Sequence, residues 1–325
     1  MAGAWQGIGA SARLPTALIV AGPTCGGKSA LAMDLAERLG GTVINADSMQ
    51  VYRELRILTA RPGLADEARV PHALYGVRPA AEPGSAAWWR AEALAAMATS
   101  RVPILCGGTG MYLAALTTGI ADIPDPGSAA RTEARDLLTM IGPNALHARL
   151  AAADPATAAT LRPNDSQRVA RAWEVLRGTG QGLADWHRTP PQLPPWQFRM
   201  VLLDPPRPDL RAAIAGRFAA MLDAGALDEV RALLALHLDP ALPAMRAHGV
   251  PELAAFLAST TTLAEATRRA TLATGQYTKR QATWFRGRSP VAPDMTHTIH
   301  ARYAGYTQFS ESQWRALMQF VKGAG

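Results

Sequence analysis

One segment near the N-terminus restricts the fold of this 325-residue chain more than any other feature. An apolar run, Leu14 to Ala21, leads into Gly22-Pro23-Thr24-Cys25-Gly26-Gly27-Lys28-Ser29, and helix-forming residues follow to Ala36. The middle part fits the pattern G-x-x-x-x-G-K-[ST] between a strand and a helix. This order indicates a P-loop, in which backbone N–H groups, the positive helix end and Lys28 hold phosphate, and the Ser29 hydroxyl can bind Mg²⁺.

Two further apolar runs extend the pattern. Residues 42–46 end at Asp47-Ser48, residues 102–106 end at Gly107-Gly108, and helical sequence covers 86–100. Strands that alternate with helices predict a parallel sheet with right-handed crossovers. The fold class that we expect is therefore α/β, with a P-loop parallel-sheet core.

The sequence changes character at residue 121. A break at Ile123-Pro124-Asp125-Pro126-Gly127 is followed by about seventy residues of helical patterns, and a strand-like run at 198–204 then returns to the sheet. We therefore expect a core of residues 14–120 and 196–290 and an inserted all-helical domain at 121–195. Residues 1–13 are expected to be disordered, and residues 291–325 to form a C-terminal tail.

Composition excludes several classes of protein. Lysine plus arginine number 33 against 26 aspartate plus glutamate, an excess that favours an anionic partner. Cys25 and Cys106 form no CxxC pair, which speaks against a disulfide scaffold or a structural zinc site. Without a signal peptide pattern or an apolar window of ~18 residues, we expect a cytoplasmic monomer with no membrane partner.

Asp47 is the candidate acid of the site. A P-loop triphosphatase normally carries an acidic metal ligand after a core strand, but residues 102–106 end in glycine instead. Asp47 is then available as a general base, and a magnesium ligand or a helix N-cap is the alternative. Cys25, for which no base partner is visible, is interpreted as a small loop residue.

Two helical segments have patterns typical of RNA contacts. The first is predicted from Asp165 to Arg177, with Gly178 as its stop. Val169, Trp173 and Leu176 form its apolar face, and Gln167, Arg168 and Arg171 lie off that face. The second, from Arg268 to Arg288, has six basic and no acidic residues, with aromatic residues between them. A solvated helix face is the alternative for the first segment, and core aromatics are the alternative for the second.

Arg217 occupies a position where an apolar residue is expected. Leu210, Ile214 and Met221 share its helix face at spacings of three, four and seven residues. The guanidinium either snorkels at the edge of that face or points into the active site to hold diphosphate.

Four motifs, in this order, resemble the tRNA dimethylallyltransferase family. They are Gly22–Ser29, Asp47-Ser48-Met49-Gln50-Val51-Tyr52, Gly107-Gly108-Thr109-Gly110-Met111-Tyr112-Leu113, and the segment from Gln276 to Arg286. Shorter matches extend the resemblance over about residues 14–288. Arg61, where the family usually has lysine, departs from the pattern and puts any phosphate contact there in doubt.

The resemblance implies a reaction and roles for the residues. The family transfers a dimethylallyl group from dimethylallyl diphosphate to N6 of the adenosine 3′-adjacent to the anticodon, in tRNAs reading codons that begin with U. The product is N6-(dimethylallyl)adenosine, and diphosphate is released. By resemblance the P-loop holds the donor diphosphate with Mg²⁺ at Ser29, Asp47 is the base, Thr109 lies near both substrates, and Arg217 is the third catalytic candidate.

The resemblance also implies contacts with the anticodon stem-loop of tRNA. The implied residues are Asp47, Ser48, Met49, Gln50, Thr109, Arg131, Gln167, Arg168, Val169, Ala170, Arg171, Lys279, Arg280, Gln281, Trp284 and Arg286. An adenylate isopentenyltransferase is the first alternative, disfavoured by the long insertion and the basic helix. A small-molecule P-loop kinase is the second, disfavoured by the missing acid after residues 102–106. A non-catalytic RNA-binding protein is disfavoured because Lys28, Ser29 and Asp47 are present.

Overall fold

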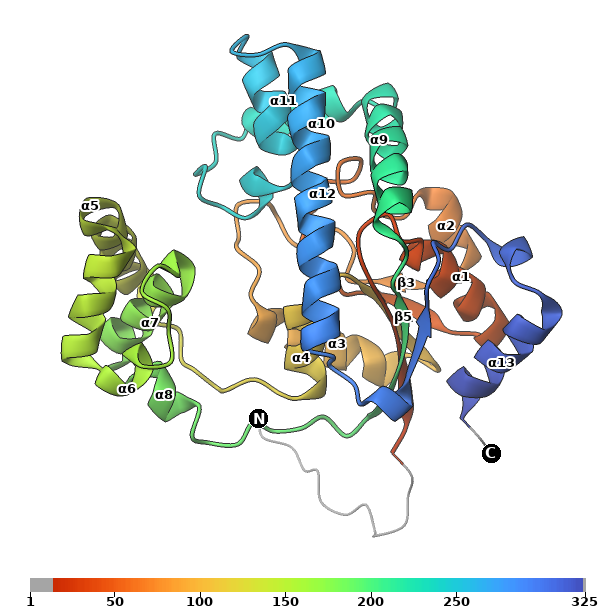
Figure 1. The fold of residues 1–325 in the computed structure, drawn as a ribbon, viewed down its shortest axis with the longest axis horizontal. Helices are drawn as coiled ribbons and strands as arrows, with labels where there is room; N and C mark the ends of the chain where they lie inside the picture. Colours follow the sequence, from red (N-terminus) through yellow and green to blue (C-terminus); the bar gives the residue numbers. More distant parts are fainter. Residues whose placement is uncertain (1–13, 324–325) are drawn as a thin grey trace. The chain divides into compact units, whose positions relative to one another are not determined.

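The computed structural model describes residues 14–323, which divide into two compact units (Figure 1). One unit is Gly119–Leu193, and the other combines the segments before and after it. The expected disorder of residues 1–13 lies outside the described residues.

The larger unit is built on a sheet of six parallel strands, in the order β3-β2-β4-β1-β5-β6. Their bounds are β1 (Thr16–Ala21), β2 (Thr42–Asn45), β3 (His72–Ala73), β4 (Pro103–Gly107), β5 (Gln197–Leu203) and β6 (Thr296–Ile299). β1 is central, with Leu18 opposite Ile104 of β4 and Arg199 of β5. The predicted α/β fold with a parallel sheet is confirmed, and the P-loop follows the carboxyl end of its central strand.

Helices cover both faces because successive side chains of a strand point to opposite faces. Leu18 and Val20 pack with α1 (Lys28–Leu39) and α13 (Glu311–Lys322), which lie on the same side of the sheet in Figure 1. Ile19 and Met200 belong to the core on the other face. The helices of that face are α3 (Ala86–Thr99), α4 (Gly110–Thr117), α9 (Arg207–Asp223), α10 (Ala226–Leu234), α11 (Val250–Leu257) and α12 (Leu263–Gly287).

Short elements complete the sheet unit. They are α2 (Leu64–Arg69) and the 3-10 turns η1 (Ala244–Arg246), η2 (Pro293–Met295) and η3 (Tyr306–Gln308).

The expectation of a C-terminal tail after residue 290 is wrong. β6 pairs with β5, with Thr296 opposite Met200, and α13 buries Trp314, Leu317 and Val321 against the α1 face of the sheet. β6 is a four-residue edge strand whose first three residues are polar, and β3 has only two residues. Neither gives the apolar run that marks the central strands, so the sequence pattern contains no signal for them.

All regular elements of the smaller unit are helices. They are α5 (Gly127–Ala153), α6 (Pro155–Ala158), α7 (Ser166–Thr179) and α8 (Leu183–Trp186). Leu150, Ala158 and Ala172 form a separate small core. The predicted stop of α7 at Gly178 is wrong by two residues, because Gly180, with φ 75°, takes the left-handed conformation that ends the helix.

Candidate active site

The P-loop connects β1 to the N-terminus of α1. The first N–H groups of a helix have no partner within it, so the amides at Lys28 and Ser29 begin an anion-binding end. Lys28 Nζ donates to the Pro23 carbonyl at 2.9 Å, which folds the side chain back over the loop. Burial lowers the pKa of Lys28. The loop thus presents backbone donors and one lysine to the same space.

A cavity of about 690 Å³ lies in front of the loop. The loop contributes Thr24, Cys25, Gly27, Lys28 and Ser29, and the ends of β2 and β4 contribute Asp47 and Gly107. Other charged side chains of the lining are Arg56, Arg61, Arg217 and Arg302, and the apolar ones include Ile57, Leu58, Ile214, Phe218 and Met221. A space with a cationic part and an apolar wall suits a small ligand that has phosphate on one end and hydrocarbon on the other.

Asp47 is held by a network that starts at a buried asparagine. Asn45 is fully buried; its Oδ1 accepts the Asp47 N–H at 2.8 Å, and its Nδ2 donates to the carbonyls of Asp47 and Leu74 at 3.0 and 3.1 Å. Asp47 Oδ1 accepts the Met49 N–H at 2.9 Å. The carboxylate therefore has a fixed place on the cavity wall. Sequence reasoning missed Asn45.

Thr109 supports the same turn from the neighbouring strand. Its Oγ1 accepts the Ser48 N–H at 2.9 Å and donates to Ser48 Oγ at 3.3 Å, and its own N–H donates to the Ala46 carbonyl at 3.2 Å. Thr109 and Asp47 are 62 positions apart in the sequence but lie on adjoining turns, because β2 and β4 are neighbours.

Arg217, the basic residue on the apolar face of its helix, lies on the cavity wall. Its Nη1 approaches Cys25 Sγ at 3.8 Å, and its Nη2 donates to the Thr59 carbonyl at 3.3 Å. α9 thus brings a guanidinium to the P-loop. Arg61, the departure from the family pattern, also lines the cavity, but its Nη1 donates to the carbonyls of Tyr52 and Arg53 at 3.1 and 3.0 Å.

A glutamate of α10, which sequence reasoning missed, fixes the loop that carries Thr59. The Glu229 carboxylate accepts three successive backbone N–H groups, those of Arg56, Ile57 and Leu58, the last two at 2.7 and 2.8 Å. This loop lines the cavity from residue 56 to 61. Glu229 therefore acts on the cavity without lining it.

Exchange of Glu229 for glutamine (E229Q) should raise the Michaelis constant for the phosphate ligand of the cavity several-fold. Two backbone N–H groups donate to Oε1 and one donates to Oε2. In either orientation of a glutamine amide, its NH₂ group would therefore face at least one of these N–H groups, and that N–H would have no acceptor. An unmet donor costs about 1–3 kcal/mol. Exposed Glu92 provides the matched control E92Q, and equal constants for both variants would remove Glu229 from this role.

The chain has matches to two family models. The model described as IPP transferase covers residues 50–288, and that described as isopentenyl transferase covers residues 15–70. The tRNA dimethylallyltransferase of Granulibacter bethesdensis is 63% identical over 311 residues, 94% of this chain and 98% of that protein. The chain belongs to the IPP transferase family. The enzyme of the same name from Gluconobacter oxydans is 62% identical, with 94% of each chain covered.

Solved structures of this family have the same fold. The tRNA isopentenylpyrophosphate transferase of Bacillus halodurans superposes with a TM-score of 0.64 at 29% identity, over 95% of both chains. A eukaryotic dimethylallyltransferase, described as acting on tRNA, gives a TM-score of 0.78 at 25% identity, over 95% of this chain and 80% of the other. The resemblance inferred from four motifs is thereby confirmed over nearly the full length.

In this IPP transferase family member, α12 divides its residues between two faces. Lys279, Arg280 and Arg286 are exposed, with Arg280 over the ring of Tyr277 at 5.5 Å and Arg286 paired with Asp204 at 3.0 Å. Trp284 is half-buried. A hollow along the exposed side is lined by Gln276, Lys279, Arg280, Thr283, Trp284, Gly287 and Arg288.

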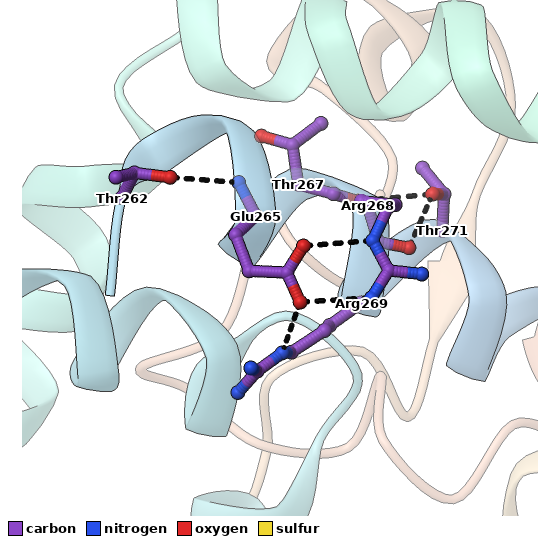
Figure 2. A network of polar contacts seen from close by, with 6 residues as sticks. All are labelled: Thr262, Glu265, Thr267, Arg268, Arg269 and Thr271. Carbon is purple, nitrogen blue, oxygen red and sulfur yellow. Dashed lines mark hydrogen bonds and ion pairs between the residues drawn. The ribbon is translucent and has the colours of Figure 1, made fainter. Parts of the chain in front are cut away.

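The first turns of α12 are less positive than the run of arginines suggests. Figure 2 shows Glu265, whose N–H donates to Thr262 Oγ1 at 3.2 Å, between Arg268 and Arg269. Both arginines bind its carboxylate at 2.7 Å, and these bonds lower the pKa of Glu265 to about 2. Arg268 and Arg269 share this one carboxylate, and Arg286 pairs with Asp204, so Lys279 and Arg280 are the exposed basic residues of α12 whose charge is not offset by an ion pair in the described part of the chain.

Two residues that the resemblance assigns to RNA contact are buried in the structure. Gln281 is 3% exposed, and its amide bonds to backbone groups of two loops. Val169 is fully buried in the helical unit, as its place on the apolar face with Trp173 and Leu176 predicts. The other RNA candidates of that unit, Gln167, Arg168, Arg171 and Arg131, are exposed, and Ala170 is partly exposed. Arg131, Arg168 and Arg171 pair with Asp125, Asp165 and Glu174.

The donor set of the cavity fits a hard cation. Ser29 and Asp47 offer oxygen atoms on the cavity wall, the ligand type that Mg²⁺ prefers. Within residues 14–323 no three His, Cys, Asp or Glu side chains gather as a metal site. A divalent ion would thus complete its coordination with ligand phosphates and water.

Among residues 14–323, no helix is long and apolar enough to cross a membrane.

Proposed function

We propose that the chain transfers a dimethylallyl group from dimethylallyl diphosphate to N6 of the adenosine 3′-adjacent to the anticodon, in tRNAs reading codons that begin with U. The observation that carries the proposal is one cavity that joins the P-loop, Asp47 and Arg217 to an apolar wall. Its relatives at over 60% identity are tRNA dimethylallyltransferases. The product is N6-(dimethylallyl)adenosine, and the second product is diphosphate.

Different groups of the cavity bind the leaving diphosphate and accept the proton of the adenine amine. The N–H groups at the start of α1, Lys28 and Arg217 bind the diphosphate and oppose the charge that grows on it as the allylic C–O bond breaks. The adenine N6 forms the new C–N bond and gives its proton to the Asp47 carboxylate. Mg²⁺, when bound through Ser29, supplies further positive charge to the leaving group.

The acceptor base has to leave its stack to enter the cavity, as in other enzymes that modify a base. We assign contacts with the anticodon stem-loop to the turn from Asp47 to Gln50 and to Thr109. In α12 the contacts belong to Lys279, Arg280, Trp284 and Arg286. In the helical unit, expected at 121–195, they belong to Arg131 and the start of α7. Because the acceptor is a tRNA, we further propose that the reaction takes place in the cytoplasm and that the protein acts as a monomer.

Labelled dimethylallyl diphosphate tests the proposal directly. The chain is incubated with the label and Mg²⁺, with tRNA in one reaction and AMP in the other. We expect label in tRNA alone, in the base next to the anticodon. Label in AMP would identify an adenylate isopentenyltransferase, and ATP turnover without prenyl transfer would identify a kinase.

Exchange of Arg280 for alanine (R280A) should weaken tRNA binding and reduce its dependence on salt, because each phosphate contact releases counterions. Affinity for the prenyl donor should stay nearly constant, since Arg280 is exposed and does not line the cavity. A salt titration of tRNA binding measures the slope. The control is R315A, which removes one exposed arginine from α13. If both variants keep the wild-type slope, Arg280 has no phosphate contact.

A further inference from the structure

The inner face of α12 packs directly on the turn after β4. Tyr277, Gln281 and Trp284 follow one another at helical spacing on this face. A methyl group at Gly108 would lie 2.1 Å from Gln281 Nε2, and one at Gly110 would lie 2.2 Å from the Trp284 ring. Only glycine permits so close an approach, so the turn and the helix fit each other.

Gln281 connects this turn to the P-loop. Its Oε1 accepts the Thr24 N–H at 2.8 Å, and its Nε2 donates to the Gly108 carbonyl at 3.0 Å. Thr24 follows β1 and Gly108 follows β4, which are neighbouring strands. One buried amide therefore ties together the ends of two strands that border the cavity.

The position of Thr24 affects two neighbouring residues of the P-loop that contact cationic side chains. Its neighbour Pro23 provides the carbonyl that receives Lys28 Nζ, and its other neighbour, Cys25, provides the sulfur that Arg217 approaches. A shift of Thr24 would thus displace the partners of both cations. The Thr24 N–H itself is engaged by Gln281, which leaves phosphate binding to the later amides of the loop.

We propose that Gln281 is a positioning residue for the diphosphate of the prenyl donor and not a contact for tRNA. The proposal rests on the proposed function, which supplies the diphosphate ligand. Lys279 and Arg280 lie on the exposed side of the same helix. The outer face of α12 is thus accessible to tRNA, whereas its inner face contacts the P-loop through Gln281.

Two variants separate positioning from a general structural role. Q281M keeps the length of the side chain and loses both hydrogen bonds, whereas Q281E keeps an acceptor for the Thr24 N–H and loses the donor to the Gly108 carbonyl. The control is Q319M, at an exposed glutamine of α13 that lines neither the cavity nor the hollow along α12. The measurements are the Michaelis constant for dimethylallyl diphosphate, inhibition by inorganic diphosphate, tRNA binding without donor, and the thermal midpoint.

For Q281M we expect the donor Michaelis constant and the diphosphate inhibition constant to rise roughly tenfold, as the loss of two buried hydrogen bonds implies. Q281E should raise both constants at least as far as Q281M, because it sets a buried carboxylate oxygen against the Gly108 carbonyl and adds negative charge near the diphosphate site. The affinity for tRNA should stay unchanged in both variants. Reduced tRNA affinity with a normal donor constant would overturn the proposal in favour of an RNA contact, and parallel losses in every measurement would reduce Gln281 to a structural residue. Failure of the wild type to prenylate tRNA would overturn the proposed function as well, whereas wild-type behaviour of Q281M overturns only the role of Gln281.

Discussion

Substitution of Asp47 by asparagine (D47N) will slow prenyl transfer by ~10²–10⁴-fold, the usual contribution of a general base. The exocyclic amine of adenine is a poor nucleophile, and an amide cannot take its proton. Asparagine has the same size, and its Oδ1 can still accept the Met49 N–H that fixes the side chain. The Asn45 network is untouched because it reaches the backbone of Asp47. The loss should therefore appear in kcat, with tRNA affinity preserved.

Single-turnover transfer from labelled donor, beside tRNA binding, measures this effect. Exposed Asp294 of the same unit gives the control D294N, which should behave as wild type. A D47N enzyme with the wild-type rate would exclude Asp47 as base. A shift of the Mg²⁺ dependence to higher concentration, with a normal rate at saturating metal, would favour the alternative of a metal ligand.

The parts of the fold that the sequence predicted are those with local signals. β1, β2, β4 and β5 are buried runs of apolar residues, and the P-loop motif specifies strand, turn and helix together. β6 and α13 were not predicted as parts of the core. β6 is placed by its pairing with β5, and α13 by its packing on the sheet face that α1 covers, and both partners lie far away in the sequence. The sheet therefore extends beyond the point where the predicted core ended.

The candidate site shows the same division. Lys28, Asp47 and Arg217 could be predicted because a motif or a break in a helix pattern marks each of them. Asn45 and Glu229 hold backbone groups of other segments, and no local pattern shows which segments will meet. Val169 illustrates a conflict between two arguments, since its helix face predicted burial and the resemblance implied RNA contact. The burial that the helix pattern predicted is confirmed, because an apolar side chain on the inner face of a helix packs in the core.

Replacement of Lys28 by alanine (K28A) will weaken donor binding and slow transfer by ~10²–10³-fold, because the cation opposes charge that develops on the departing diphosphate. Burial lowers the pKa of Lys28, while Asp47 nearby favours the charged form. The side chain is held at the Pro23 carbonyl, at the mouth of the loop. Its control is K322A on α13, an exposed lysine far along the chain from the loop.

The same variant distinguishes a prenyl donor from ATP as the ligand of the P-loop. ATP also offers adjoining phosphates to the amides of α1, so it should compete weakly with dimethylallyl diphosphate and lose affinity in K28A as the donor does. It should not be hydrolysed, because β4 ends in glycine where a triphosphatase carries its metal-binding acid, and the apolar wall of Phe218 and Met221 suits a hydrocarbon chain. Calorimetry of both ligands, beside a phosphate-release assay, measures these differences. ATP turnover that a small acceptor stimulates, with no prenyl transfer to tRNA, would contradict the assignment of this loop to a diphosphate leaving group.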